Sequence, residues 1–175
     1  MKETVKKLVY ANHKYVTTGK LTGKVSARIR QENSDGQKPW AVIITCSDSR
    51  VIPEAVFSAG LGELFVVRTA GNVIGAAELG SVEYAIDHLH VDTVIVMGHT
   101  GCGAVNAALH GEFAGAVGVI TRRIKEAVGE ESDPYRACRL NVLSGVSILK
   151  KELNGKVTVK GAIYDIVSGQ VAFLD

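Results

Sequence analysis

Several features that often assign a function to a chain are missing from these 175 residues. The formal net charge is only +2, and no basic stripe is long enough to indicate nucleic-acid binding. No apolar segment approaches the ~20 residues that span a bilayer. The amino-terminal residues 1–7 are polar and lack the apolar region of a signal peptide. We therefore expect a cytoplasmic protein with neither nucleic-acid nor membrane partners.

Cysteine is also scarce, with three residues at positions 46, 102 and 138. In the cytoplasm these residues should remain thiols, which favours metal binding or catalysis over disulfides. The hydrophobic content of 46% and charged content of 22% are ordinary for a globular protein. No linker, repeat or low-complexity segment divides the sequence, so we predict a single domain over residues 1–175.

Apolar runs alternate with segments of helical spacing along most of the chain. Strands are predicted at residues 41–45, 64–67, 91–97 and 157–164, with an antiparallel edge strand at 170–174. Helices are predicted at residues 3–18, 53–58, 76–89, 102–110, 115–128 and 135–151, and residues 19–38 as a loop or a short helix. This order predicts an α/β fold with a mainly parallel central sheet of four strands, an antiparallel edge strand, flanking helices and an N-terminal helical arm.

Two polar segments each follow an apolar run and carry residues that bind metals. Cys46 follows the first predicted strand, and His99 and Cys102 follow the third. Functional side chains in open α/β sheets gather beyond the carboxyl ends of the strands, so these three should converge. Two thiols and one imidazole, with a fourth position open or occupied by Asp48, are typical of zinc enzymes. The alternative is three unrelated core residues, which is our interpretation of Cys138 alone.

Asp48 and Arg50 extend the first of these segments. A bidentate salt bridge from Arg50 would orient Asp48 and keep it ionised beside a metal, although such a pair alone could be an ordinary turn contact. Asp48 could then accept a hydrogen bond from water at the metal or become its fourth ligand. Other motifs fit less well. Cys46 and Arg50 are too close for a phosphatase loop, and Asn106 replaces the last small residue of a dinucleotide fingerprint.

Four segments together resemble the β-class carbonic anhydrases. They are Cys46-Ser-Asp-Ser-Arg50, Phe65-Val-Val-Arg68-Thr-Ala-Gly-Asn72, Ser81-Val-Glu-Tyr84-Ala and Gly98-His-Thr-Gly-Cys-Gly-Ala104. The resemblance implies zinc-dependent reversible hydration of carbon dioxide to bicarbonate and a proton through zinc-bound hydroxide. It implies Zn²⁺ held by Cys46, His99 and Cys102, with Asp48 and Arg50 as the catalytic dyad. The alternatives are a COS/CS₂ hydrolase on the same scaffold, a non-catalytic zinc-binding protein and, less well supported, a nucleotide-binding module.

The resemblance also implies a homodimer or higher homo-oligomer with active sites at the subunit interface. Residues 1–38 would then form a helical arm and loop that pack on the partner subunit. Four positions match the substrate pocket of the family: Gln37, Phe65, Tyr84 and Gly103.

A second subgroup of the family has a regulatory bicarbonate pocket built from Trp, Arg and Tyr. Arg68 and Tyr164 match two of these residues, but Ile43 stands where the Trp is expected and Trp40 comes three residues early. Together with Gln37, this difference favours an open, water-bound site over one closed by Asp48. His13 is the one candidate for a proton shuttle, and buffer could serve instead.

Overall fold

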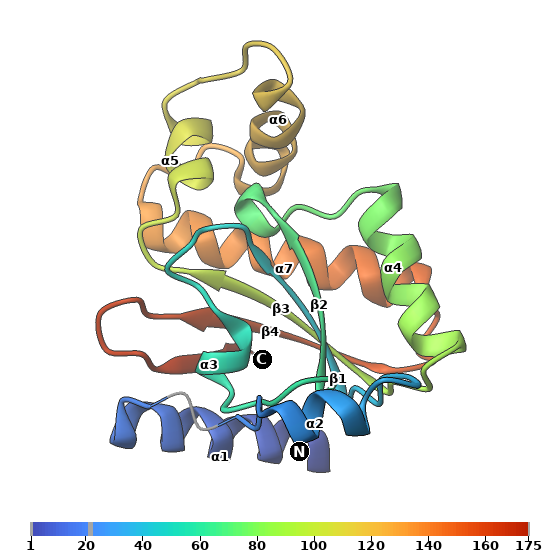
Figure 1. The fold of residues 1–175 in the computed structure, drawn as a ribbon. Coiled ribbons are helices and arrows are strands. Elements are labelled where there is room, and N and C mark those ends of the chain that lie inside the picture. The colour runs from blue at the N-terminus through green and yellow to red at the C-terminus, as the bar shows by residue number, and fades with distance from the viewer. Residues whose placement is uncertain (1, 21–22, 175) are drawn as a thin grey trace.

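The computed structural model describes residues 2–20 and 23–174 and shows a sheet between layers of helices (Figure 1). The strands are β1 (Ala41–Cys46), β2 (Leu64–Thr69), β3 (Thr93–His99), β4 (Thr158–Tyr164) and β5 (Val171–Leu174). The helices are α1 (Glu3–Thr18), α2 (Ala27–Glu32), α3 (Pro53–Val56), α4 (Ala76–Asp87), α5 (Gly103–Leu109), α6 (Val117–Val128) and α7 (Pro134–Glu152). A 3₁₀ turn, η1 (Ala70–Asn72), follows β2. The predicted fold class is confirmed.

The strand order brings the two metal-binding segments to neighbouring strands. The sheet runs β2-β1-β3-β4-β5, with parallel pairing throughout except between β4 and β5. Thr45 pairs with Met97, and His99 pairs with Tyr164. Because β1 and β3 are parallel neighbours, their carboxyl ends lie side by side at one edge of the sheet.

Alternate residues of the central strands supply two cores. Val42 and Ile44 of β1 face a core shared with α4 and α7, whereas Ala41 and Ile43 face one shared with α1 and α3. A Cβ on Gly98 would lie 2.7 Å from a methyl group of Val142, so the missing side chain lets α7 approach the sheet closely. The position of α7 over the strand ends therefore depends on that glycine.

Helix α1 packs on the sheet of its own chain. Leu8 is completely buried, and the Asn12 side chain, also buried, joins three elements. Asn12 Nδ2 donates hydrogen bonds to the carbonyls of Val56 and Gly169, and Asn12 Oδ1 accepts one from the backbone N–H of Val171. Helix α2 buries none of its residues. Packing of residues 1–38 on a partner subunit stays a prediction.

Several bounds differ by a few residues from the expectations, and two differences lie beside the metal-binding segments. Strand β3 ends at His99, two residues later than predicted, because its pairing with β4 continues to Tyr164. Turn η1 was not predicted, and it contains Gly71 and Asn72 with φ of +66° and +46°.

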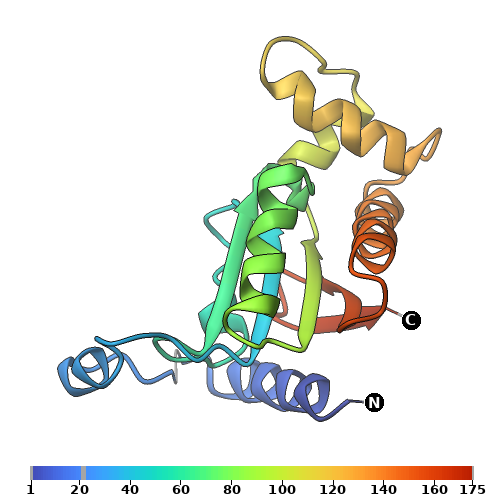
Figure 2. The same cartoon turned by 90° about the vertical axis from the view of Figure 1, so that its right-hand side faces the viewer.

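Figures 1 and 2 show α5 and α6 standing apart from the sheet, away from α1. None of the described helices is long and apolar enough to cross a membrane.

Candidate active site

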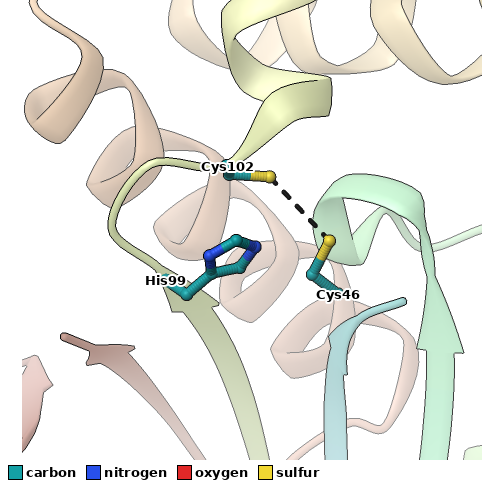
Figure 3. A group of neighbouring side chains, drawn as sticks. All are labelled: Cys46, His99 and Cys102. Carbon is teal, nitrogen blue, oxygen red and sulfur yellow. Dashed lines mark hydrogen bonds between the residues drawn. The ribbon is translucent and has the colours of Figure 1, made fainter. Parts of the chain in front are cut away.

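The three predicted metal ligands converge. Cys46 ends β1, His99 ends β3, and Cys102 precedes α5. Their ligand atoms all lie within 4.8 Å of one another, and the two Sγ atoms are 3.9 Å apart. Figure 3 shows the two sulfurs and the imidazole ring turned toward a common space. The side chains are at most 5% exposed, so this group is held inside the protein at the edge of the sheet.

The imidazole of His99 is arranged to bind a metal. Its Nδ1 lies 2.9 Å from the carbonyl oxygen of Thr100, which places the ring proton on Nδ1 and leaves a lone pair on Nε2. Nε2 is buried and has no hydrogen-bond partner among the described residues. A buried nitrogen without a partner lowers the stability of the fold unless a bound ligand, such as a metal ion, contacts it. The donor set of two sulfurs and one nitrogen fits zinc.

The two thiols have opposite pKa shifts. The hydrogen bond from Cys102 lowers the pKa of Cys46 to about 4 despite burial, with further help from His99 and the backbone. The same contact and burial raise the pKa of Cys102. The backbone N–H of Gly71 also points at Cys46 Sγ, 3.2 Å away. These opposite shifts favour one thiolate and one thiol in the metal-free pair, and a metal ion that binds both sulfurs would displace the remaining proton.

Arg50 holds both carboxylate oxygens of Asp48. Arg50 Nε lies 2.9 Å from Oδ1 and Nη2 lies 2.7 Å from Oδ2, while the backbone N–H of Arg50 also donates to Oδ1. These hydrogen bonds hold the pKa of the Asp48 carboxyl well below its usual range. Oδ2 is 3.8 Å from His99 Nε2, so the carboxylate lies at the mouth of the Cys46–His99–Cys102 group. Arg50 also donates to the carbonyl of Gly101 and thereby links the two polar segments.

Arg68 has a role that the sequence did not indicate. The resemblance matched it to a regulatory anion pocket, but its guanidinium donates to the backbone carbonyls of Cys46 and Asp48 at 3.2 and 2.7 Å. The other two positions compared with that pocket are both buried, Ile43 in β1 and Tyr164 in β4. Arg68 thus braces the backbone on either side of Ser47.

One chain does not bring the predicted pocket residues together. Gly103 follows Cys102 and begins α5, beside the metal-binding group. Phe65 pairs with Val42 near the start of β2, whereas Thr69 pairs with Cys46, so Phe65 lies about 13 Å along the strand from that level. Its ring centroid is 6.3 Å from that of Tyr84, which is exposed. Gln37 is exposed and lies near Gly62, in the loop that enters β2.

Cys138 lies in α7 outside the group of three ligands. It is buried, and burial raises the pKa of its thiol to about 11. This position agrees with the interpretation of Cys138 as a core residue.

An α/β sheet with a Cys-His-Cys group at the ends of adjacent parallel strands is typical of metal-dependent enzymes of the α/β class. The family model for carbonic anhydrase matches residues 41–171. The chain is 37% identical to carbonic anhydrase 2 of Mycobacterium tuberculosis, over 80% of this chain and 76% of that protein. It is 34% identical to a carbonic anhydrase of Mycolicibacterium smegmatis, over 95% of this chain and 89% of that protein.

The solved structure of the β-carbonic anhydrase CcaA has the same fold, with a TM-score of 0.73 and 26% identity. The match covers 98% of this chain and 95% of that one. The chain therefore belongs to the carbonic anhydrase family, in its β class. It is a lyase whose reaction is the reversible hydration of carbon dioxide.

Proposed function

We propose that this enzyme works with one zinc ion held by Cys46 Sγ, His99 Nε2 and Cys102 Sγ. The observation that carries the proposal is the convergence of these atoms within 4.8 Å around an unpartnered imidazole nitrogen. Three ligands of this kind leave a fourth position free, as catalytic zinc sites require. When bound, zinc makes a nucleophile available from water near neutral pH.

The charged dyad orients the reaction. The Asp48 carboxylate is an acceptor only, because the pKa of this carboxyl is held far below neutral pH. It would accept a hydrogen bond from the attacking water or hydroxide and so direct the oxygen lone pair toward the carbon of CO₂. Arg50 fixes the carboxylate through two parallel hydrogen bonds. The products are bicarbonate and one proton, which passes to water or buffer.

The position of Asp48 supports an open site. Both of its oxygens are engaged by Arg50, and Asp48 is not part of the compact ligand group. Ligation by Asp48 would require that it leave Arg50 and give up two charge-assisted hydrogen bonds. We assign the resting state to an open fourth position on this ground.

The substrate pocket is completed by a second copy of the chain. Gln37, Phe65 and Tyr84 lie toward the amino ends of the strands, away from the metal ligands of their own chain. Phe65 and Tyr84 form an aromatic pair beside the edge strand β2, with Tyr84 49% exposed. A partner subunit packed on this edge would receive these side chains in its own site. The proposed assembly is thus a homodimer or a multiple of one.

The proposed location is the cytoplasm. Cys46, Cys102 and Cys138 are all free thiols, as is usual in a reducing compartment. Metal ligands of this kind also work only while their sulfurs stay reduced.

Three variants test the ligand assignment. Cys46→Ala and His99→Ala should each lose the bound zinc and the CO₂ hydration rate, measured by elemental analysis and stopped-flow indicator assay. Cys138→Ala is the matched control, since it removes a third buried thiol and should retain both. Full zinc content in Cys46→Ala would contradict the assignment.

Competition among CO₂, COS and CS₂ on the wild-type enzyme tests the alternative COS/CS₂ hydrolase activity. Zinc-loaded but inactive protein would indicate a non-catalytic site.

A further inference from the structure

The thiolate ligand Cys46 receives a hydrogen bond from a strained turn. The backbone N–H of Gly71, in η1, lies 3.2 Å from Cys46 Sγ. Gly71 and Asn72 both have positive φ, which costs free energy for asparagine and is uncommon in consecutive residues. A backbone of this kind persists only where its surroundings hold it in place.

One buried side chain from a distant part of the sequence holds this turn. Asn141, in α7, is 6% exposed, and its Nδ2 donates a 2.8 Å hydrogen bond to the carbonyl of Gly71. The Thr69 hydroxyl closes the turn by donating to the carbonyl of Val73. A Cβ on Gly71 would lie 2.7 Å from Ile124 Cδ1, so α6 packs directly against the turn. Of these contacts, the Asn141 bond fixes the same residue whose N–H faces the sulfur.

We infer that Asn141 is a positioning residue for the metal site: it holds Gly71 so that the backbone N–H stays directed at the Cys46 sulfur. The inference rests on the proposed role of Cys46 as a zinc ligand. An N–H donor withdraws electron density from a metal-bound sulfur and fixes its direction, and second-shell partners of this kind tune the metal. Asn141 itself touches neither metal nor substrate in this arrangement.

The chain offers a matched control for Asn141. Asn12 is also 6% exposed and also donates from Nδ2 to backbone carbonyls, but it joins α1 to α3 and to the turn before β5. Asn141→Ala and Asn12→Ala should therefore both lower the free energy of unfolding. Asn141→Leu keeps the branched shape of the side chain and has no hydrogen-bonding atom. It separates the hydrogen bond from simple packing.

The test uses Co²⁺ in place of zinc, because the thiolate-to-cobalt charge-transfer band reports on the sulfur electrons. In Asn141→Ala and Asn141→Leu this band should move to longer wavelength, and chelator competition should show zinc affinity about tenfold or more below wild type. Asn12→Ala should leave the band and the affinity unchanged. An unmoved band in both Asn141 variants, or an equal shift in Asn12→Ala, would overturn the inference.

A substitute variant and an NMR measurement on the wild-type protein also test the role of Asn141. If Asn141→Ala and Asn141→Leu do not fold, Asn141→Ser, which is too short to reach Gly71, takes their place with the same expected shift. In the unmodified protein loaded with ¹¹³Cd, the amide proton of Gly71 should show scalar coupling to the metal, and its absence would also overturn the inference. A wild-type protein without any thiolate-to-cobalt band would instead refute the proposed ligand set.

Discussion

At the scale of single residues, the hydrogen bonds from Arg50 set both the charge and the orientation of the Asp48 carboxylate. The pKa of Cys46 is lowered by its neighbours, and the pKa of the adjacent Asp48 carboxyl is also lowered because Arg50 holds both oxygens. Arg50 is itself tied to the Gly101 carbonyl in the second segment. The orientation of Asp48 is therefore set jointly by the ends of β1 and β3.

Asp48→Asn should separate metal binding from catalysis. The amide has nearly the same size but lacks the charge, and it places a donor where an acceptor is required. We expect unchanged zinc content and a hydration rate reduced by about 10²-fold, the scale of a lost proton-handling group. Zinc analysis and stopped-flow kinetics on the same preparation measure both. A near wild-type rate would show that Asp48 has no catalytic role.

Arg50→Gln should change the titration of Asp48. In the wild type, hydrogen bonds from Arg50 lower the pKa of Asp48 below the ordinary value of 3.8, so the carboxylate stays charged as the pH falls through 3.8. Without the guanidinium, the midpoint should rise toward that value, because burial, which opposes ionisation, is then balanced less completely. Carbon-13 NMR of the carboxyl group measures the midpoint. Arg28→Gln, which removes an exposed partner of Glu32, should leave it unchanged.

At the scale of elements, the strand ends were predictable and the turn that supports them was not. The apolar runs of β1 and β3 and the polar residues after them are local in sequence, so the positions of Cys46 and His99 followed from strand-end geometry. Asn141 lies in a helix without any local mark of function, and its contact with Gly71 exists only after α7 packs on the sheet. Arg68 likewise acts through backbone carbonyls, which no side-chain motif reveals.

Two substitutions in helix α1 test whether its apolar face packs on the core of its own chain. Leu8 is 0% exposed against the chain's own core, and its neighbour Val9 is 42% exposed. Leu8→Ala should lower the free energy of unfolding by about 2–5 kcal/mol. Val9→Ala should change it by no more than about 0.5 kcal/mol. Urea unfolding of both variants gives the comparison, and similar values for the two would contradict the observed packing.

At the scale of the whole molecule, three of the predicted pocket residues lie apart from the Cys46–His99–Cys102 group of their own chain. Motif matching identified Gln37, Phe65 and Tyr84, but register places Phe65 four residues from the level of Cys46. Hydrophobic periodicity and the position of strand ends describe a single chain, so neither predicts a contact between subunits. The packing of residues 1–38 on a partner stays a prediction that rests on the family resemblance alone.

Subunit complementation tests whether the partner completes the pocket. Asp48→Asn should be inactive with an intact pocket, and the double variant Gln37→Ala/Tyr84→Ala should retain its metal ligands but have little activity. Mixed dimers of the two would contain one site in which both parts are intact. Co-refolding at equal amounts should restore about one quarter of the wild-type sites. Activity that stays at the mean of the two parents would place the pocket within a single chain.

The separation of the ligands along the chain has a thermodynamic consequence. A metal bound to Cys46, His99 and Cys102 ties β1 to β3, and the unfolded chain offers no comparable site. Each tenfold rise in free metal above the dissociation constant then adds about 1.4 kcal/mol to the stability of the fold. When metal is scarce, the sheet loses this cross-link and the unfolded population open to proteases increases. The lifetime of the protein would thus depend on the supply of its metal as well as on its sequence.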